Sequence, residues 1–194
     1  MAQADTERRH RFDALFAAYR PEVVAYCGWR ASSASDAQDA AAEVFLTAWR
    51  RLDDVPEGDA ARIWLYATAR RVLANQRRAG RRRIALHERL ALEAESAAQE
   101  QAPLDREETL VHEALGRLWA RDREVLLLAE WEGLSPAEMA KVLGCLTVTA
   151  RGKLHRARRR FQTVYEELLA ADGNRHRRPA PTRTYFAKEN HEHA

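Results

Sequence analysis

Apolar residues follow a helical period along almost the whole chain, and nowhere do they alternate with polar residues as in a half-buried strand. Between Phe12 and Cys27 they recur three or four positions apart, and similar stripes cover residues 41–52, 63–73, 110–118 and 125–129. This spacing places the apolar side chains on one face of a helix. The sequence therefore predicts an all-α fold, and 194 residues suffice for one large domain or two small ones.

Breaks in the apolar pattern divide the first half of the chain into elements. A helix is expected over Phe12–Trp29, in which Pro21 can open a fresh turn. Ser35 can begin the next helix, because Gln38 three positions later completes a capping box. Proline and glycine in Asp53–Asp59 predict a loop, and a long helix is expected from about Ala60 to Arg78, with a basic run behind it.

The charges are distributed unevenly although the formal net charge is only +3. Residues 60–87 contain eight arginines and no acid, whereas residues 88–113 contain eight acids and two arginines. Alanine, glutamate and Pro103 dominate the middle of that acidic stretch, which indicates a linker between two small helical domains. The expected boundaries are a first domain at 10–85, an acidic linker at 86–106, a second domain at 107–170 and a disordered tail at 171–194.

Residues Ser135 to Arg160 have the features of a helix-turn-helix. Ser135 is an N-cap, Pro136 occupies the first helical position and Glu138 closes a capping box, so a short helix is expected up to Gly144. A basic helix from Thr147 follows the glycine turn. In this motif the second helix enters the major groove of DNA.

Seven bases and no acid lie between residues 139 and 165, with Lys141 in the short helix and the other six in the second helix. The alternative is a plain helical hairpin with a solvated basic face, but the acid-free run beside a correctly built turn favours DNA binding. The side chains expected to contact phosphates and base edges are Thr147, Thr149, Arg151, Lys153, His155 and Arg158.

The helix from Trp64 to Arg83 combines aromatic residues at one end with arginines along the other. Such a surface suits single-stranded DNA, because bases stack on rings while arginines follow the backbone. Trp64 is equally consistent with a core position.

Other classes of protein find no support in the sequence. Cys27 and Cys145 lie far apart and no Cys/His cluster occurs, so no disulfide framework, metal or other cofactor is expected. No nucleophilic triad or catalytic carboxylate pair can be placed, and no enzymatic activity is expected. No stretch approaches the roughly 18 apolar residues that span a bilayer, and the polar N-terminus does not read as a signal peptide, so a cytoplasmic protein without membrane insertion is expected.

In this order, the motifs resemble the extracytoplasmic-function (ECF) group of sigma factors. Asp39-x-x-x-Glu43-Val44-Phe45-Leu46-x-x-Trp49 and Arg62-x-Trp64-Leu65-Tyr66 are similar to region 2 of the family. Glu138-Met139-Ala140-x-x-Leu143-Gly144 and Leu154-x-Arg156-Ala157-Arg158 are similar to region 4. The resemblance extends over about residues 12–169.

This resemblance implies that the two domains bind different targets. The first would bind core RNA polymerase and hold the single-stranded minus-ten element, with a flipped base received by the loop Asp53–Asp59. The second would read the duplex minus-thirty-five element through Thr147–Arg160, and the linker would thread a channel of the polymerase. An anti-sigma factor is a further implied partner. The implied polymerase contacts are Asp39, Glu43, Phe45, Leu46 and Trp49. The implied contacts with the single-stranded minus-ten element are Trp64, Arg70, Arg71, Asn75 and Arg78.

The residues by themselves leave one alternative function open. A helix-turn-helix regulator would bind duplex operator DNA without polymerase, using its first domain to sense a signal or to dimerise. A sigma factor requires core polymerase for promoter-specific transcription, whereas a regulator binds its operator alone.

Overall fold

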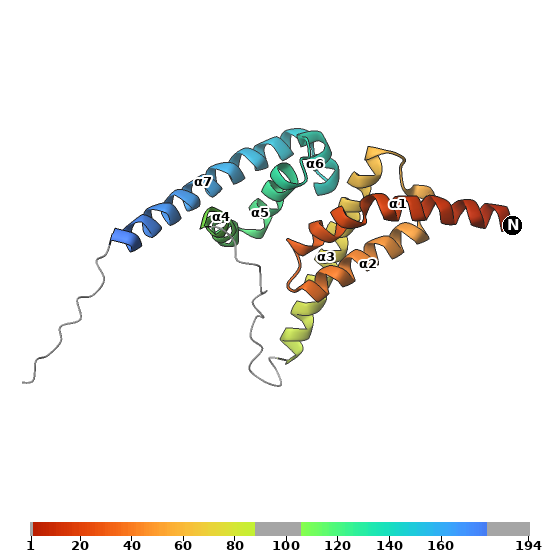
Figure 1. The fold of residues 1–194 in the computed structure, drawn as a ribbon, viewed down its shortest axis with the longest axis horizontal. Coiled ribbons are helices and arrows are strands. Elements are labelled where there is room, and N and C mark those ends of the chain that lie inside the picture. Colours follow the sequence, from red (N-terminus) through yellow and green to blue (C-terminus); the bar gives the residue numbers. More distant parts are fainter. Residues whose placement is uncertain (1, 88–105, 178–194) are drawn as a thin grey trace, which may run out of the picture.

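The computed structural model describes residues 2–87 and 106–177, and these residues form helices and no strand (Figure 1). The predicted all-α fold is confirmed, whereas most of the predicted linker and residues 178–194 of the predicted tail lie outside the described residues. The elements in chain order are α1 Ala2–Gly28, α2 Ala34–Arg50, the 3₁₀ turn η1 Leu52–Asp54, α3 Asp59–His87, α4 Arg106–Arg117, α5 Ala120–Leu126, the π-helical turn η2 Leu127–Trp131, α6 Pro136–Leu143 and α7 Thr147–Arg177.

Helices α1, α2 and α3 pack together as a first helical group (Figure 1). The apolar stripes that the periodicity identified form its core, because a helix gains stability mainly by burying such a face. Thr68 is buried with them and donates its hydroxyl to the Trp64 carbonyl at 2.9 Å. The buried apolar residues are Val23, Tyr26, Cys27, Ala37, Ala40, Ala41, Val44, Phe45, Ala48, Leu52, Val55, Ala61, Ile63, Leu65, Tyr66, Ala69, Val72 and Leu73.

Helix α1 is longer than the sequence predicted. It begins at Ala2 rather than Phe12, and Pro21 lies inside it instead of opening a separate turn. Polar contacts stabilise the early turns: Arg8 donates to the Trp49 carbonyl at 2.7 Å, and Arg11 donates to the Val55 carbonyl at 2.8 Å. A search for apolar periodicity does not detect such contacts.

The N-cap of α2 is Ser33, so the predicted capping box of Ser35 and Gln38 is wrong. The Ser33 hydroxyl accepts the backbone N–H of Asp36 at 3.1 Å, which satisfies one of the free donors at the helix start. Ser33 and Ser35 each precede a possible partner by three residues, Asp36 and Gln38, so the local sequence does not distinguish the two caps.

The second helical group consists of α4 to α7. The helix expected at Arg121–Trp131 is present as α5 and η2, but its last turn is π-helical, because the backbone N–H of Glu132 donates to the carbonyl of Leu127, five residues back, at 3.0 Å. Gly133 ends this turn with φ of +64°, a conformation that favours glycine.

The predicted helix-turn-helix is present in α6 and α7. Ser135 and Glu138 form both bonds of the capping box, and Gly144 ends α6 in the left-handed conformation with φ of 64°. Ala140 and Ala150 are buried where the two helices pack, so small side chains allow their close approach.

Helix α7 continues to Arg177 rather than ending near Leu169, so residues 171–177 of the predicted tail are helical. Leu168 is buried in a small cluster with Leu110 and Ala114 of α4. Arg106 also donates to Asp172 at 2.7 Å. These contacts with α4 extend the helix into a polar sequence that has no apolar period of its own.

The candidate nucleic-acid interface

The outer face of α7 carries the predicted duplex-binding side chains. Thr149, Arg151, His155 and Arg158 are exposed, while Thr147 and Lys153 are half-buried. Leu154 and Ala157 point inward, as the helical period requires. The helix therefore presents a basic surface along its N-terminal half.

Arg158 does not stand free on this face. Its side chain, 58% exposed, forms an ion pair with Glu130 of η2 at 2.8 Å. Sequence reasoning missed this pair, because Glu130 lies 28 residues away in the chain. An exposed ion pair contributes about 0–1 kcal/mol, so Arg158 can exchange this carboxylate for a phosphate at little cost.

The predicted single-strand-binding residues lie along α3. Arg71, Asn75 and Arg78 are exposed, and Arg78 donates to the Asn75 side-chain oxygen at 2.8 Å. Arg70 is half-buried, and so is Trp64, whose ring lies against the core rather than fully in solvent.

A small cavity lies beside the loop that was expected to receive a flipped base. It measures about 270 Å³ and lies between α1 and the segment from Leu52 to Ala61. The Tyr19 hydroxyl donates to the Gly58 carbonyl at 3.1 Å, and Gly58 itself has φ of +61°. The loop is therefore tied to α1 at a position that favours glycine.

The outer face of α2 contains most of the residues that were expected to contact polymerase. Asp39, Glu43 and Leu46 are exposed, and Trp49 is half-buried. Phe45 is a correction, because it is only 4% exposed and packs against Phe16 with ring centroids 4.8 Å apart. Phe45 therefore packs in the core between α2 and α1 and does not belong to the exposed face of α2.

The basic faces of α3 and α7 converge on one cavity of about 560 Å³, which we call the interface cavity. Three predicted DNA-binding residues line it, namely Arg70 and Arg78 of α3 and Lys153 of α7. Further cationic side chains around it are Arg77, Arg121, Arg156 and Arg160, and its acids are Asp122 and Glu124. Asp122 is buried and pairs with Arg160 at 2.5 Å.

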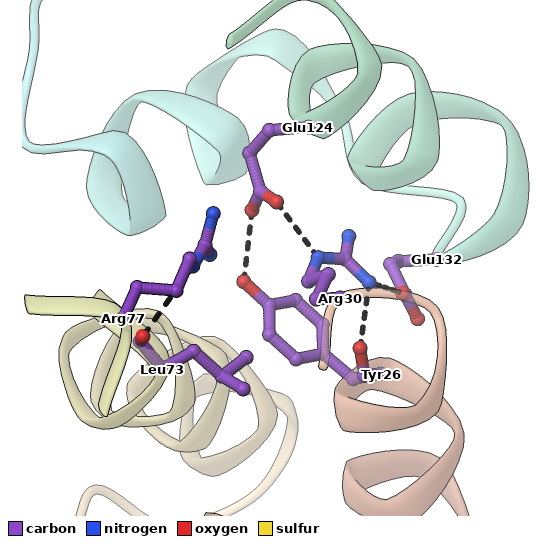
Figure 2. Close-up of polar contacts among 6 residues, drawn as sticks. All are labelled: Tyr26, Arg30, Leu73, Arg77, Glu124 and Glu132. Atoms are coloured by element: carbon purple, nitrogen blue, oxygen red, sulfur yellow. Dashed lines mark hydrogen bonds and ion pairs between the residues drawn. The ribbon is translucent and has the colours of Figure 1, made fainter. Parts of the chain in front are cut away.

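A buried polar network links the two helical groups beside this cavity (Figure 2). Arg30 follows the end of α1, and its side chain is only 3% exposed. Its Nε donates to Glu124 of α5 at 2.8 Å, and its Nη1 donates to Glu132 at 3.1 Å. The Tyr26 hydroxyl donates to Glu124 at 2.9 Å, and the Arg30 guanidinium lies 3.6 Å from the centroid of the Tyr26 ring.

Burial sets the protonation states of this network. It opposes the charge of Arg30, but the attraction of Glu124, Tyr26 and Glu132 prevails and raises the pKa of the guanidinium. Burial also raises the pKa of Glu132, against the opposing attraction of Arg30. The pKa of Tyr26 is raised by burial and then by Glu124, so its hydroxyl remains a neutral donor.

Two family models match the chain, Sigma-70 region 2 over residues 15–83 and Sigma-70, region 4 over residues 108–161. The RNA polymerase sigma-H factor of Pseudomonas aeruginosa is 30% identical over 172 residues, which cover 83% of this chain and 89% of that protein. The chain belongs to the sigma-70 family of RNA polymerase sigma factors.

Further relatives identify this sigma factor as one of the ECF type. The ECF RNA polymerase sigma factor SigL of Mycobacterium tuberculosis is 32% identical to it, with 70% of this chain and 77% of SigL covered. The sigma factor RpoE of Bartonella quintana, solved in complex with the anti-sigma factor NepR, matches with a TM-score of 0.65 and 25% identity, covering 83% of this chain and 98% of RpoE. CnrH, solved with the cytosolic domain of CnrY, matches with a TM-score of 0.59 and 25% identity, covering 88% of this chain and 95% of CnrH.

The two family matches fall on the two helical groups of the sigma factor. The region 2 match covers the second half of α1, all of α2 and most of α3, and the region 4 match extends from α4 into α7. No helix in the described parts of the chain has an apolar stretch long enough to cross a bilayer.

Sequence reasoning missed Arg30, which links the two groups. One signal could have identified it: Arg30 lies four residues after Tyr26 and continues the buried face of α1. A charged residue that prolongs an apolar stripe is a candidate for a buried ion pair.

Proposed function

We propose that this sigma factor directs core RNA polymerase to promoters by binding two DNA elements with two basic helices, α3 and α7. The observation that supports this most strongly is the presence of acid-poor, arginine-rich faces on α3 and α7, one in each family-matched region. RNA synthesis is left to the polymerase, so we propose no catalytic role for any side chain of this chain. Its place of action would be the cytoplasm, where polymerase meets DNA.

Helix α7 would read the duplex minus-thirty-five element. Arg151 and Arg158 are exposed and can form bidentate hydrogen bonds with guanine edges or phosphates. Thr149 and His155 lie on the same surface, and Thr147 and Lys153 at its margin would add contacts to the backbone.

Helix α3 would hold the opened minus-ten element. Arg70, Arg71 and Arg78 would follow the phosphates, and Asn75 can form hydrogen bonds with a base edge. Trp64, half-buried, would offer only part of its ring face for stacking. The cavity beside the loop at Gly58 is the natural receiver for a flipped base.

The outer face of α2 would bind the polymerase through Asp39, Glu43 and Leu46, with Trp49 at its edge. Leu46 is a large apolar residue with 47% exposure, as expected of an unoccupied protein interface. RpoE and CnrH were solved with the proteins NepR and CnrY. By analogy we propose that this sigma factor, too, has an anti-sigma partner.

Run-off transcription with purified core polymerase tests the proposal. Arg151→Ala and Arg158→Ala should weaken use of promoters that depend on the upstream element and make transcription more sensitive to salt. Asn75→Ala should slow formation of the open complex and leave duplex binding by α7 intact. Specific, tight duplex binding without polymerase, together with no start-site selection in its presence, would instead identify a helix-turn-helix regulator.

A further inference from the structure

The Arg30 network is the polar centre of an interface between the two helical groups. Around it, Trp29 at the end of α1 contacts the second group twice, with ring centroids 5.4 Å from Trp131 and 4.6 Å from His112. Most buried apolar residues of both groups form one continuous cluster, and only Leu110, Ala114 and Leu168 form a separate one among the described residues. The two groups are therefore packed against each other and not merely tethered by the intervening chain.

In this closed arrangement the two DNA-binding faces cannot serve one promoter. Arg70 and Arg78 of α3 share the interface cavity with Lys153 of α7. The minus-ten and minus-thirty-five elements lie about 25 base pairs apart, which is roughly 85 Å at 3.4 Å per pair. The groups must separate before both helices can reach their elements.

Two features of the interface oppose the closed arrangement. Seven cationic side chains and two acids line the interface cavity, so like charges face each other across it. The Nη2 atom of Arg30 is buried and has no hydrogen-bond partner among the described residues. An unmet buried donor is unfavourable, so the interface is suited to reversible release.

We propose that Arg30, held by Glu124 and Glu132, is a latch that keeps the free sigma factor closed, and that release of this latch precedes promoter binding. A buried guanidinium requires charged hydrogen-bond partners, because burial removes its hydration. On separation of the groups, water solvates all three charges, and phosphates can bind the cationic side chains of α3 and α7. This inference rests on the proposed function of those two helices.

Energy transfer between two dyes on the full-length chain tests the latch. Ala17 of α1 and Ala137 of α6 are exposed and can be replaced by cysteine for labelling, in a Cys145→Ser background, and α6 packs against α3 of the first group. Cys27 can remain, because burial raises the pKa of its thiol to about 11 and keeps it unreactive at neutral pH. The latch variant is Glu124→Gln with Glu132→Gln, which preserves size and hydrogen bonding but removes both charges.

The matched control is Glu113→Gln with Glu166→Gln. It removes the same charge from exposed positions of α4 and α7, where each acid bonds within its own helix. Wild type and control should show high transfer efficiency, and the latch variant should lose at least half of it. Affinity for a forked promoter fragment that carries both elements should rise about tenfold in the latch variant, because only separated groups can reach both elements and the separated fraction increases.

Arg30→Lys provides a second variant if the double substitution impairs folding, because it keeps the charge but cannot bond both carboxylates through a planar fork. Equal transfer in all variants, or low transfer in the free wild type, would overturn the latch. Run-off transcription with the same proteins separates the two ideas: normal promoter selection with unchanged transfer refutes the latch alone. Loss of transfer in the latch variant, with no promoter selection by any of the proteins, refutes the proposed function but still supports the closed interface.

Discussion

At the scale of single residues, surroundings give the same side chain different roles. The Arg30 side chain is 3% exposed and bonds two carboxylates, whereas the Arg158 side chain is 58% exposed and forms one surface pair. A buried guanidinium without partners is strongly unfavourable, while an exposed pair contributes about 0–1 kcal/mol. Arg30 therefore stabilises the folded structure, whereas Arg158 can exchange its carboxylate partner for a phosphate.

Phe45 and Leu46 are adjacent in α2, and we expect opposite effects from their removal. Phe45→Ala should lower the free energy of unfolding by about 3–5 kcal/mol, because it empties a buried site beside Phe16. Leu46→Ala should leave stability within about 0.5 kcal/mol but weaken binding to core polymerase. Urea denaturation and a pull-down with polymerase measure the two effects. Equal stability of both variants would contradict the assignment of Phe45 to the core.

At the scale of elements, caps and neighbouring helices decide where each helix begins and ends. The Ser135 capping box and the left-handed Gly144 confine α6 to Pro136–Leu143 and set the turn that leads into the recognition helix. At the other end of α7, contacts with α4 maintain the helix beyond its apolar period. The first type of boundary is local in sequence and the second is not.

Ser135→Ala should destabilise the helix-turn-helix by about 1 kcal/mol, because it removes an N-cap. Hydrogen bonds from Ser135 lower the pKa of Glu138 below its usual value of 4.5. The corresponding stabilisation is fully present above that value and is lost as the pH falls through the lowered pKa. Thermal melts at neutral and acidic pH should show that the difference between wild type and variant shrinks in acid. A constant difference would count against the capping box as its source.

Leu168 and Leu169 offer a matched pair near the end of α7. Leu168 is 1% exposed and Leu169 is 44% exposed. Leu168→Ala should cost about 2–5 kcal/mol and speed amide exchange in the last turns of α7, because those turns depend on packing against α4. Leu169→Ala should change little. Hydrogen exchange resolved by mass spectrometry distinguishes the two, and similar exchange in both variants would refute the role of Leu168.

At the scale of the whole molecule, the small net charge of +3 conceals an interface with strong local repulsion. The chain is nearly balanced in total, yet its arginines face one another across the interface cavity. Packing around Trp29 and the Arg30 latch offset this repulsion in the closed arrangement. Promoter DNA supplies the opposite charge and would favour separation.

Salt should therefore favour the closed arrangement of the free protein. Charges across the solvent-filled cavity are screened as the Debye length falls from about 30 Å at 0.01 M to about 8 Å at 0.15 M, whereas the buried latch is screened much less. Transfer efficiency of the dye-labelled wild type should rise over this range, and that of the Glu124→Gln and Glu132→Gln variant should stay low. A fall in wild-type efficiency with added salt would show that attraction between exposed charges holds the groups together.

The sequence alone determined the helical fold, most core residues and the helix-turn-helix, because each depends on neighbours within a few positions. Periodicity identified the buried stripes of α2 and α3, and Ser135, Pro136, Glu138 and Gly144 set the bounds of α6. The sequence also placed basic side chains on the outer faces of α3 and α7.

Tertiary structure alone decided how the two groups meet. Arg30 bonds to acids 94 and 102 residues away, and Phe45 is buried by Phe16 of another helix. Spacing along one helix shows which side chains share a face, but it does not show what covers that face. Burial against a distant partner depends on the packing of the whole chain, and this packing determines whether an arginine holds the two groups together or remains free to bind DNA.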